Sequence, residues 1–131
     1  MIRAGAYLLA SALAASSAVA EDIEVPSGIS VTRQEILHDM LMGELWLRFR
    51  YVAPRIGKEA GSVTFDVAVI DIDYLCDEDA VPHVLANDLD PARIVVSMAD
   101  RVMDFGATDP NATQFFGAYR LENQRCIWEE F

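Results

Sequence analysis

Alternating apolar and polar residues mark one strand clearly, in the segment 43–54 ("GELWLRFRYVAP"). Its apolar side chains fall on every second position: Leu45, Leu47, Phe49 and Tyr51. This spacing is typical of a strand with one buried face, and Pro54 ends it. A second extended segment, with less regular alternation, precedes it and follows a turn at 26–28. Because Gly43 lies between the two segments, we expect them to form a hairpin.

The segment 62–81 ("SVTFDVAVIDIDYLCDEDAV") fits two kinds of secondary structure. Its valines and isoleucines favour a strand. Apolar residues also recur at helical spacing: Phe65, Ile72, Leu75 and Cys76. In a helix, Asp66 lies in the first turn, where the helix dipole favours a negative charge. The pattern therefore predicts the main helix over about 64–79, ending before Pro82, and a strand remains the alternative.

In the second half of the chain, alternation predicts two more strands, at 92–100 and 102–107. The Asp-Pro dipeptide at 109–110 is a helix-start signal, which predicts a short second helix over about 110–117. The tail alternates again and predicts a closing hairpin that turns at 123–124. No repeat or linker divides the chain. Strand pairs combined with one main helix indicate a single small domain of the α+β class, with mostly antiparallel strands.

The first 20 residues ("MIRAGAYLLASALAASSAVA") have the three parts of a secretory signal peptide. Arg3 supplies the positive charge, 4–15 is apolar, and the small residues 18–20 suit cleavage. This apolar stretch is shorter than the roughly 20 residues that cross a bilayer. We therefore expect a cleaved signal over 1–20, one domain over 21–131, a periplasmic or secreted location, and no membrane association after cleavage.

Composition narrows the choice of partners. The chain carries 21 acidic and 10 basic residues, a formal net charge of −11. This balance repels phosphate backbones and anionic lipid, so nucleic acid and membrane surfaces are disfavoured. The two cysteines allow one intramolecular pair, and an oxidising compartment favours a disulfide between Cys76 and Cys126. Metal-bound thiolates are the alternative, but the CxxC spacing typical of such sites is absent.

Six ordered motifs carry a resemblance over nearly the whole mature chain: "VPSG", "RFRYVAP", "YLC", "IVVSMADR", "FGATDPNATQFFGAYRL" and "CIWEEF". They resemble a family of small exported proteins of unknown function from marine alphaproteobacteria of the Rhodobacter type. The resemblance implies a helix at 65–76, and both cysteines fall inside matching motifs. It implies no catalytic residues. Some members carry an acetolactate synthase label, which this chain does not support because a thiamine-diphosphate enzyme needs far more chain and a diphosphate-binding region.

The acidic segment 71–90 is the candidate for metal chemistry. Its densest group is Asp77, Glu78 and Asp79. A helix-loop-helix calcium site needs glycine at its sixth position and glutamate at its twelfth, and the registers that begin at Asp71 and Asp77 provide neither. A looser divalent-metal site, or a small hydrolase that uses this segment, is therefore the alternative hypothesis.

The two histidines show no catalytic arrangement. His38 and His83 are far apart in the sequence, and no G-x-S-x-G motif accompanies them. We expect both to be surface or partly buried side chains, and we assign no catalytic residue and no cofactor.

Trp46, Arg48 and Arg50 form the candidate binding face. In an alternating strand these side chains point away from the face that carries Leu45 and Leu47. Tryptophan and arginine are enriched at interaction hot spots. The leading hypothesis is a non-enzymatic binding or interaction module with a protein or small anionic partner. The alternative is that the protein's own helix and carboxylates cover this face. The oligomeric state stays open.

Overall fold

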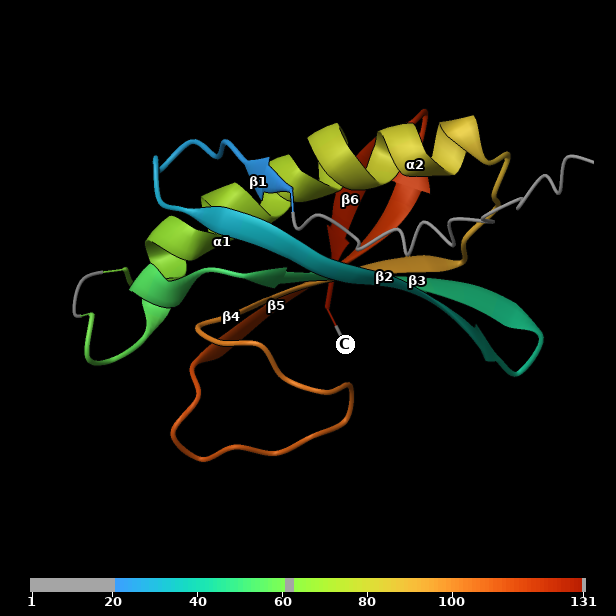
Figure 1. Ribbon diagram of the computed structural model, residues 1–131. Helices are drawn as coiled ribbons and strands as arrows, with labels where there is room; N and C mark the ends of the chain where they lie inside the picture. Colours follow the sequence, from blue (N-terminus) through green and yellow to red (C-terminus); the bar gives the residue numbers. More distant parts are fainter. Residues whose placement is uncertain (1–20, 61–62, 131) are drawn as a thin grey trace, which may run out of the picture.

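A computed structural model describes residues 21–60 and 63–130, which form a twisted six-stranded sheet with a long helix across one face (Figure 1). The strands lie in chain order, and all neighbours are antiparallel except β3 and β4. Their bounds are β1 (Asp22–Ile23), β2 (Val31–Leu41), β3 (Glu44–Val52), β4 (Arg93–Ala99), β5 (Gln114–Glu122) and β6 (Arg125–Glu129). The predicted α+β class is confirmed.

Both predicted hairpins are confirmed. The turn between β2 and β3 uses Met42 and Gly43, with φ values of 51° and 81°, as tight two-residue turns require. Asn123 and Gln124 join β5 to β6 with φ values of 50° and 62°. The alternation in β3 also has its expected result, because three apolar side chains are buried in the core: Leu47, Phe49 and Tyr51.

The chain between β3 and β4 forms a short 3₁₀ turn, η1 (Pro54–Ile56), and then the main helix. The helix consists of α1 (Phe65–Leu75), a π-helical turn η2 (Cys76–Ala80) and α2 (Val81–Ala86). The helical alternative for 65–76 is therefore confirmed. A connection of this kind is what allows β3 and β4 to run parallel.

The helix continues past Pro82, so the predicted end near residue 79 is wrong. In the π turn, the N–H of Val81 bonds to the carbonyl of Cys76, five residues earlier. Pro82 then lies in the first turn of α2, where the missing N–H of proline costs little. The helix ends at Asn87 instead, whose N–H bonds to the carbonyl of His83.

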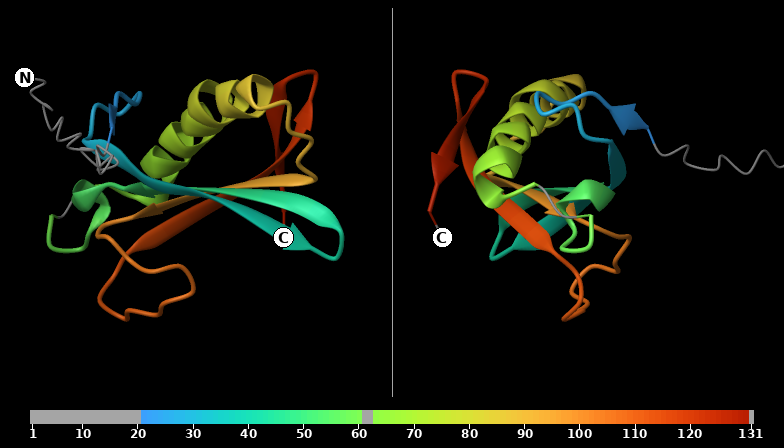
Figure 2. Two further views of the ribbon diagram at one scale, coloured as in Figure 1. Left: turned by 45° about the vertical axis from the view of Figure 1, so that its right-hand side comes forward. Right: turned by 90° about the vertical axis from the view of Figure 1, so that its left-hand side faces the viewer.

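Residues 100–113 form a loop, so the strand predicted at 102–107 and the short helix predicted at 110–117 are wrong. Asp109 does not start a helix, because its carboxylate accepts a hydrogen bond from the N–H of Asn111 at 2.9 Å within a single turn. The aromatic residues that follow favour a strand and pair with β4. This β4–β5 loop lies on the side of the sheet opposite the helix (Figures 1 and 2).

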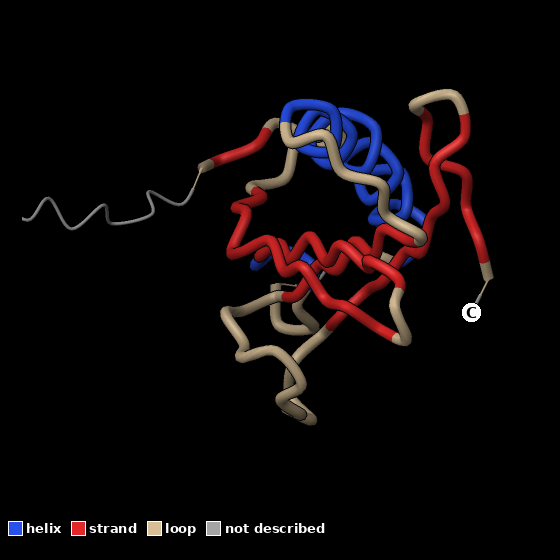
Figure 3. Tube along the Cα trace, turned by 90° about the vertical axis from the view of Figure 1, so that its right-hand side faces the viewer, coloured by secondary structure: helices blue, strands red, loops and turns tan. Residues whose placement is uncertain are grey.

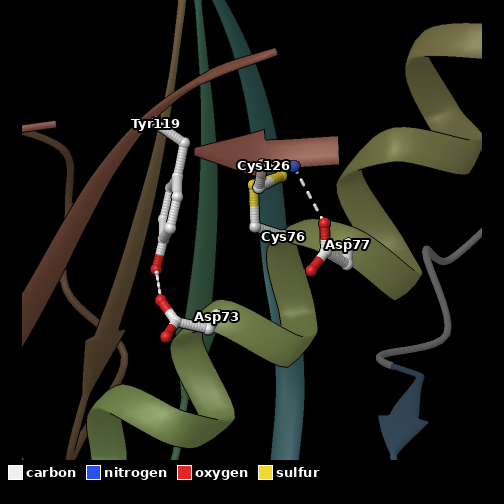
Figure 4. Close-up of a disulfide and its surroundings, with 5 residues drawn as sticks. All are labelled: Asp73, Cys76, Asp77, Tyr119 and Cys126. Carbon is white, nitrogen blue, oxygen red and sulfur yellow. Dashed lines mark hydrogen bonds between the residues drawn. A yellow bond between two sulfur atoms is a disulfide. The ribbon is translucent and has the colours of Figure 1, made fainter. Parts of the chain in front are cut away.

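Two aspartates of the helix are hydrogen-bonded to the last two strands (Figure 4). Asp73 accepts a bond from the hydroxyl of Tyr119 in β5 at 2.5 Å. Asp77 accepts a bond from the backbone N–H of Cys126 in β6 at 2.9 Å. Both carboxylates therefore join the helix to the sheet.

Two further aspartates join the helix to the first half of the chain. Asp79 accepts bonds from Nη1 of Arg33 in β2, at 2.7 and 2.9 Å, and from the hydroxyl of Tyr51 in β3, at 2.6 Å. Asp71 is fully buried and accepts bonds from the N–H of Ser27, at 2.9 Å, and from its hydroxyl, at 2.5 Å. Four helix carboxylates thus reach the N-terminal loop and four of the strands: Asp71, Asp73, Asp77 and Asp79.

Cys76 and Cys126 form the predicted disulfide, with their Cα atoms 6.1 Å apart (Figure 4). The bond links the π turn of the helix to the edge strand β6. The helix also lies close to β5 at Gly117, where an added Cβ would be 2.8 Å from Cγ2 of Ile72. A glycine is therefore needed at this crossing point.

We predict that the Cys76→Ala/Cys126→Ala variant loses roughly 4 kcal/mol of unfolding free energy, because the disulfide closes a segment of 50 residues in the unfolded chain. Urea unfolding of the variant and of the wild-type protein, with and without reductant, measures the loss. Reduced wild type is the matched control and is expected to behave like the variant. A loss below about 1 kcal/mol in both would contradict the prediction.

Candidate functional site

A cavity of about 200 Å³ lies between the outer face of the sheet and the β4–β5 loop. Figure 3 shows the loop, in tan, beyond the strands on the side away from the helix. Side chains of three central strands form its floor: Arg48, Arg50, Val95, Ser97, Gln114 and Phe116. The loop supplies the remaining wall: Asp104, Phe105, Gly106 and Ala107. The predicted arginines, Arg48 and Arg50, therefore line the floor of a cavity and do not lie on a flat surface.

Arginine and aromatic side chains alternate along this face, and we call them the arginine–aromatic stack. The guanidinium carbon of Arg93 lies 4.8 Å from the ring centroid of Trp46, and that of Arg48 lies 5.5 Å from the same ring. Phe105 then contacts Arg48 at 5.2 Å and Arg50 at 5.7 Å. Contacts of this kind contribute about 0.5–1 kcal/mol each at exposed sites. The loop is thus held to the strand by its phenylalanine.

Each arginine of the stack is also paired with a carboxylate. Arg50, only 7% exposed, bonds to Glu35. Arg48 donates from Nε to Asp39 at 3.1 Å. One part of the alternative hypothesis is therefore confirmed, since the protein's own carboxylates pair with these arginines. The other part is wrong, because the β4–β5 loop and not the helix covers the face.

The two predicted arginines, Arg48 and Arg50, differ in how many of their hydrogen-bond donors are still free. Arg50 uses Nη1 for its carboxylate and Nη2 for the carbonyl of Met103 at 2.9 Å. Arg48 uses Nε alone, and its two Nη groups have no acceptor in the part of the chain that the structure describes. Such a fork suits a planar anionic group. Arg48 is therefore the side chain with binding capacity left.

A bulge in β2 helps to fix the loop. The register between β2 and β3 shifts between Arg33 and Glu35, which leaves Gln34 as the extra residue. Its side-chain Nε2 donates to the carbonyl of Met103 at 2.8 Å, the same carbonyl that Arg50 bonds. The less regular alternation of the segment before Gly43 is the sequence signal of this bulge.

Asp100 closes the base of the loop. Its N–H bonds to the carbonyl of Thr113 at 3.0 Å, and its carboxylate accepts from the N–H of Thr113 at 3.1 Å. The guanidinium of Arg101 bonds to the same carboxylate. Hydrogen bonding from Arg101, with the N–H of Thr113, holds the pKa of Asp100 below its usual range, although burial opposes this effect. The two ends of the loop are thus joined through a charged carboxylate.

The acidic segment has a structural role in place of a metal cluster. Asp77 and Asp79 accept the hydrogen bonds described above, and Glu78 is exposed. Within residues 21–60 and 63–130, no group of three or more His, Cys, Asp or Glu side chains could hold a metal ion. Burial raises the pKa of Tyr51, and the charge of Asp79 raises it further, so the hydroxyl stays a donor to that carboxylate.

The structure brings together two residues that sequence reasoning kept apart. His38 of β2 and His83 of α2 have ring centroids 5.8 Å apart. His83 also contacts the ring of Phe49, with the centroids 5.5 Å apart. His38 is exposed and His83 is partly buried, as expected. The sequence does not predict their contact, because it depends on where the helix crosses β2.

The fold and the cavity define the class of protein: a small disulfide-bonded α+β domain with a loop-covered cavity on the free face of its sheet. The chain belongs to the family of unknown function DUF6497, whose model matches residues 7–131. No curated protein and no solved structure matches the chain. Membership of an uncharacterised family is confirmed, while the bacterial source and the acetolactate synthase label stay untested.

We predict that acid opens the base of the loop. Because the pKa of Asp100 is lowered in the folded protein, its contribution to stability is complete above the ordinary carboxyl value of about 3.9 and is lost as the pH falls below it. Hydrogen exchange at the N–H of Thr113, corrected for the intrinsic rate, is expected to accelerate below about pH 4. Asp100→Asn is the control, and its exchange should be fast at both pH values. Equal protection at pH 3 and pH 6 in the wild type would contradict the prediction.

Proposed function

We propose that this protein is a non-enzymatic binding module whose cavity holds a small anionic ligand with a single flat ring. The observation that carries the proposal is the part of the cavity lining formed by Arg48, Arg50 and Phe105. Phe105 lies over both guanidinium groups, and 56% of its surface is exposed. A ligand ring can pack on this aromatic side chain while its anionic group reaches the Nη groups of Arg48.

The size of the cavity limits the ligand. Pockets for drug-sized molecules usually measure about 300–1,000 Å³, and this cavity is smaller, at about 200 Å³. Ser97 and Gln114 add polar side chains to the floor, and Asp104 adds one negative charge to the wall. A monoanion of the size of an aromatic carboxylate fits these limits better than a larger or dianionic molecule. A protein partner that binds the arginine–aromatic stack is the second candidate ligand.

We propose that the module works in an oxidising compartment outside the cytoplasm. The support is the disulfide between Cys76 and Cys126, a bond that persists in such compartments. The signal peptide predicted over 1–20 lies outside the described residues. Among residues 21–60 and 63–130, the helices lack the length and hydropathy of a membrane span.

The hydrolase or metal-binding alternative has less support. It requires free carboxylates in the segment 71–90, and four of those acids are engaged in hydrogen bonds to other elements. The cavity lining offers Ser97 as a hydroxyl but contains no histidine to activate it. We therefore propose binding rather than catalysis.

The test is a titration of the mature protein with benzoate, followed by NMR. We expect the signals of Phe105, Ser97 and Arg48 to shift, and we expect the neutral isostere benzamide to bind at least about tenfold more weakly, since each factor of ten corresponds to about 1.4 kcal/mol. Arg48→Gln should weaken benzoate binding by about tenfold or more, because it removes a charge-assisted fork.

Arg120→Gln is the matched control, because Arg120 is an exposed arginine that pairs with Glu122 outside the cavity. Its benzoate affinity should equal that of the wild type. Equal weakening in both variants, or shifts confined to residues outside the cavity, would count against the proposal.

A further inference from the structure

His38 and His83 form a second candidate site, on the helix side of the sheet and away from the cavity. Their ring planes are nearly perpendicular, at 89°, and the centroids are 5.8 Å apart. A metal ion about 2 Å from one nitrogen of each ring holds two imidazole centroids roughly 5–6 Å apart. The observed spacing therefore suits two ligands of one ion.

His83 has a nitrogen that nothing in the described structure uses. Its Nε2 is buried and has no hydrogen-bond partner. Buried polar atoms normally have a partner, so an unpaired one needs an explanation.

The second ring nitrogen of His83, Nδ1, is compatible with a metal ion on Nε2. Nδ1 lies 3.4 Å from the side-chain Nδ2 of Asn87, a long contact. When Nε2 binds a metal ion, the proton lies on Nδ1 and needs an acceptor. Asn87 keeps its own bond from Nδ2 to the carbonyl of His83, at 2.8 Å, and the contact is exposed, so water accepts the hydrogen bond from Nδ1.

Met40 is the candidate for a third donor. It follows His38 by two positions in β2, so both side chains lie on the same face of the strand. Met40 is 63% exposed, which leaves its sulfur accessible. A carboxylate is missing from the set because Asp79, one helical turn before His83, is engaged by Arg33 and Tyr51.

We propose that His38, His83 and Met40 bind a soft monovalent metal ion of the Cu(I) and Ag(I) class. Imidazole and thioether are the donors that Cu(I) accepts, and carboxylates are what harder ions prefer. The usual protein ligands of zinc are thiolate, imidazole and carboxylate, and the thioether of Met40 is not among them. Both cysteines of the chain are in the disulfide, so no free thiol competes for the ion.

The probe is Ag(I), added as silver nitrate to the mature protein in chloride-free buffer, because silver does not change its oxidation state. Isothermal titration should give one site, and the imidazole proton signals of both histidines should shift together. Zn(II) should bind at least about tenfold more weakly, because a thioether is not among its usual ligands. Absence of silver binding, shifts elsewhere in the chain, or equally tight zinc binding would overturn the assignment.

Variants identify the ligands. His83→Gln and His38→Gln should each reduce silver affinity at least tenfold, and Met40→Leu should reduce it several-fold. Met42→Leu is the matched control, because Met42 lies fully exposed at the tip of the turn, and it should bind as the wild type does. Unchanged binding in the histidine variants, or a larger loss in the control than in Met40→Leu, refutes the proposal.

If His83→Gln does not fold, the imidazole shifts of the wild-type protein decide the question without it. The benzoate titration is independent, because that cavity lies on the other face of the sheet. Failure of one proposal therefore leaves the other intact.

Discussion

The contact between Asp79 and the pair Arg33 and Tyr51 fixes the main helix on the sheet. One carboxylate accepts three hydrogen bonds from two neighbouring strands. Three more aspartates repeat the arrangement along the helix: Asp71, Asp73 and Asp77. The described chain has a single long helix to cover one face of the sheet, so its position must be set by specific bonds as well as by apolar burial.

This constraint explains the unusual acidic segment and the π turn within it. The π turn adds a residue to the helical register between α1 and α2, in the stretch that carries Cys76, Asp77 and Asp79. Cys76 and Asp77 reach β6, while Asp79 reaches β2 and β3. These acids lie within the continuous helix and not in its last turn, and direct donors stabilise their charges. The outer face of the sheet is left to the β4–β5 loop and its cavity.

Local patterns in the sequence predicted the elements whose stability is local. The alternation in β3, the positive-φ turns and the disulfide were all accessible from composition and spacing. The disulfide is the one long-range contact among these, and it was accessible because the chain has just two cysteines. The other long-range contacts were not. Pro82 stays in the helix because a π turn precedes it, the 110–117 segment is a strand because β4 offers a partner, and His38 meets His83 because the helix crosses β2 there. Sequence spacing also placed Trp46, Arg48 and Arg50 of the arginine–aromatic stack on one face of the strand, but it did not predict the loop that covers them.

A double-mutant cycle on Asp79→Ala and Tyr51→Phe tests most directly whether the helix carboxylates hold the fold together. Each single variant removes one partner of a partly buried bond, and urea unfolding of the four proteins gives the coupling free energy. We expect a coupling of about 1 kcal/mol or more, since the acceptor is charged. Effects that add within about 0.3–0.5 kcal/mol would show that the carboxylate and the hydroxyl act independently and would contradict the account.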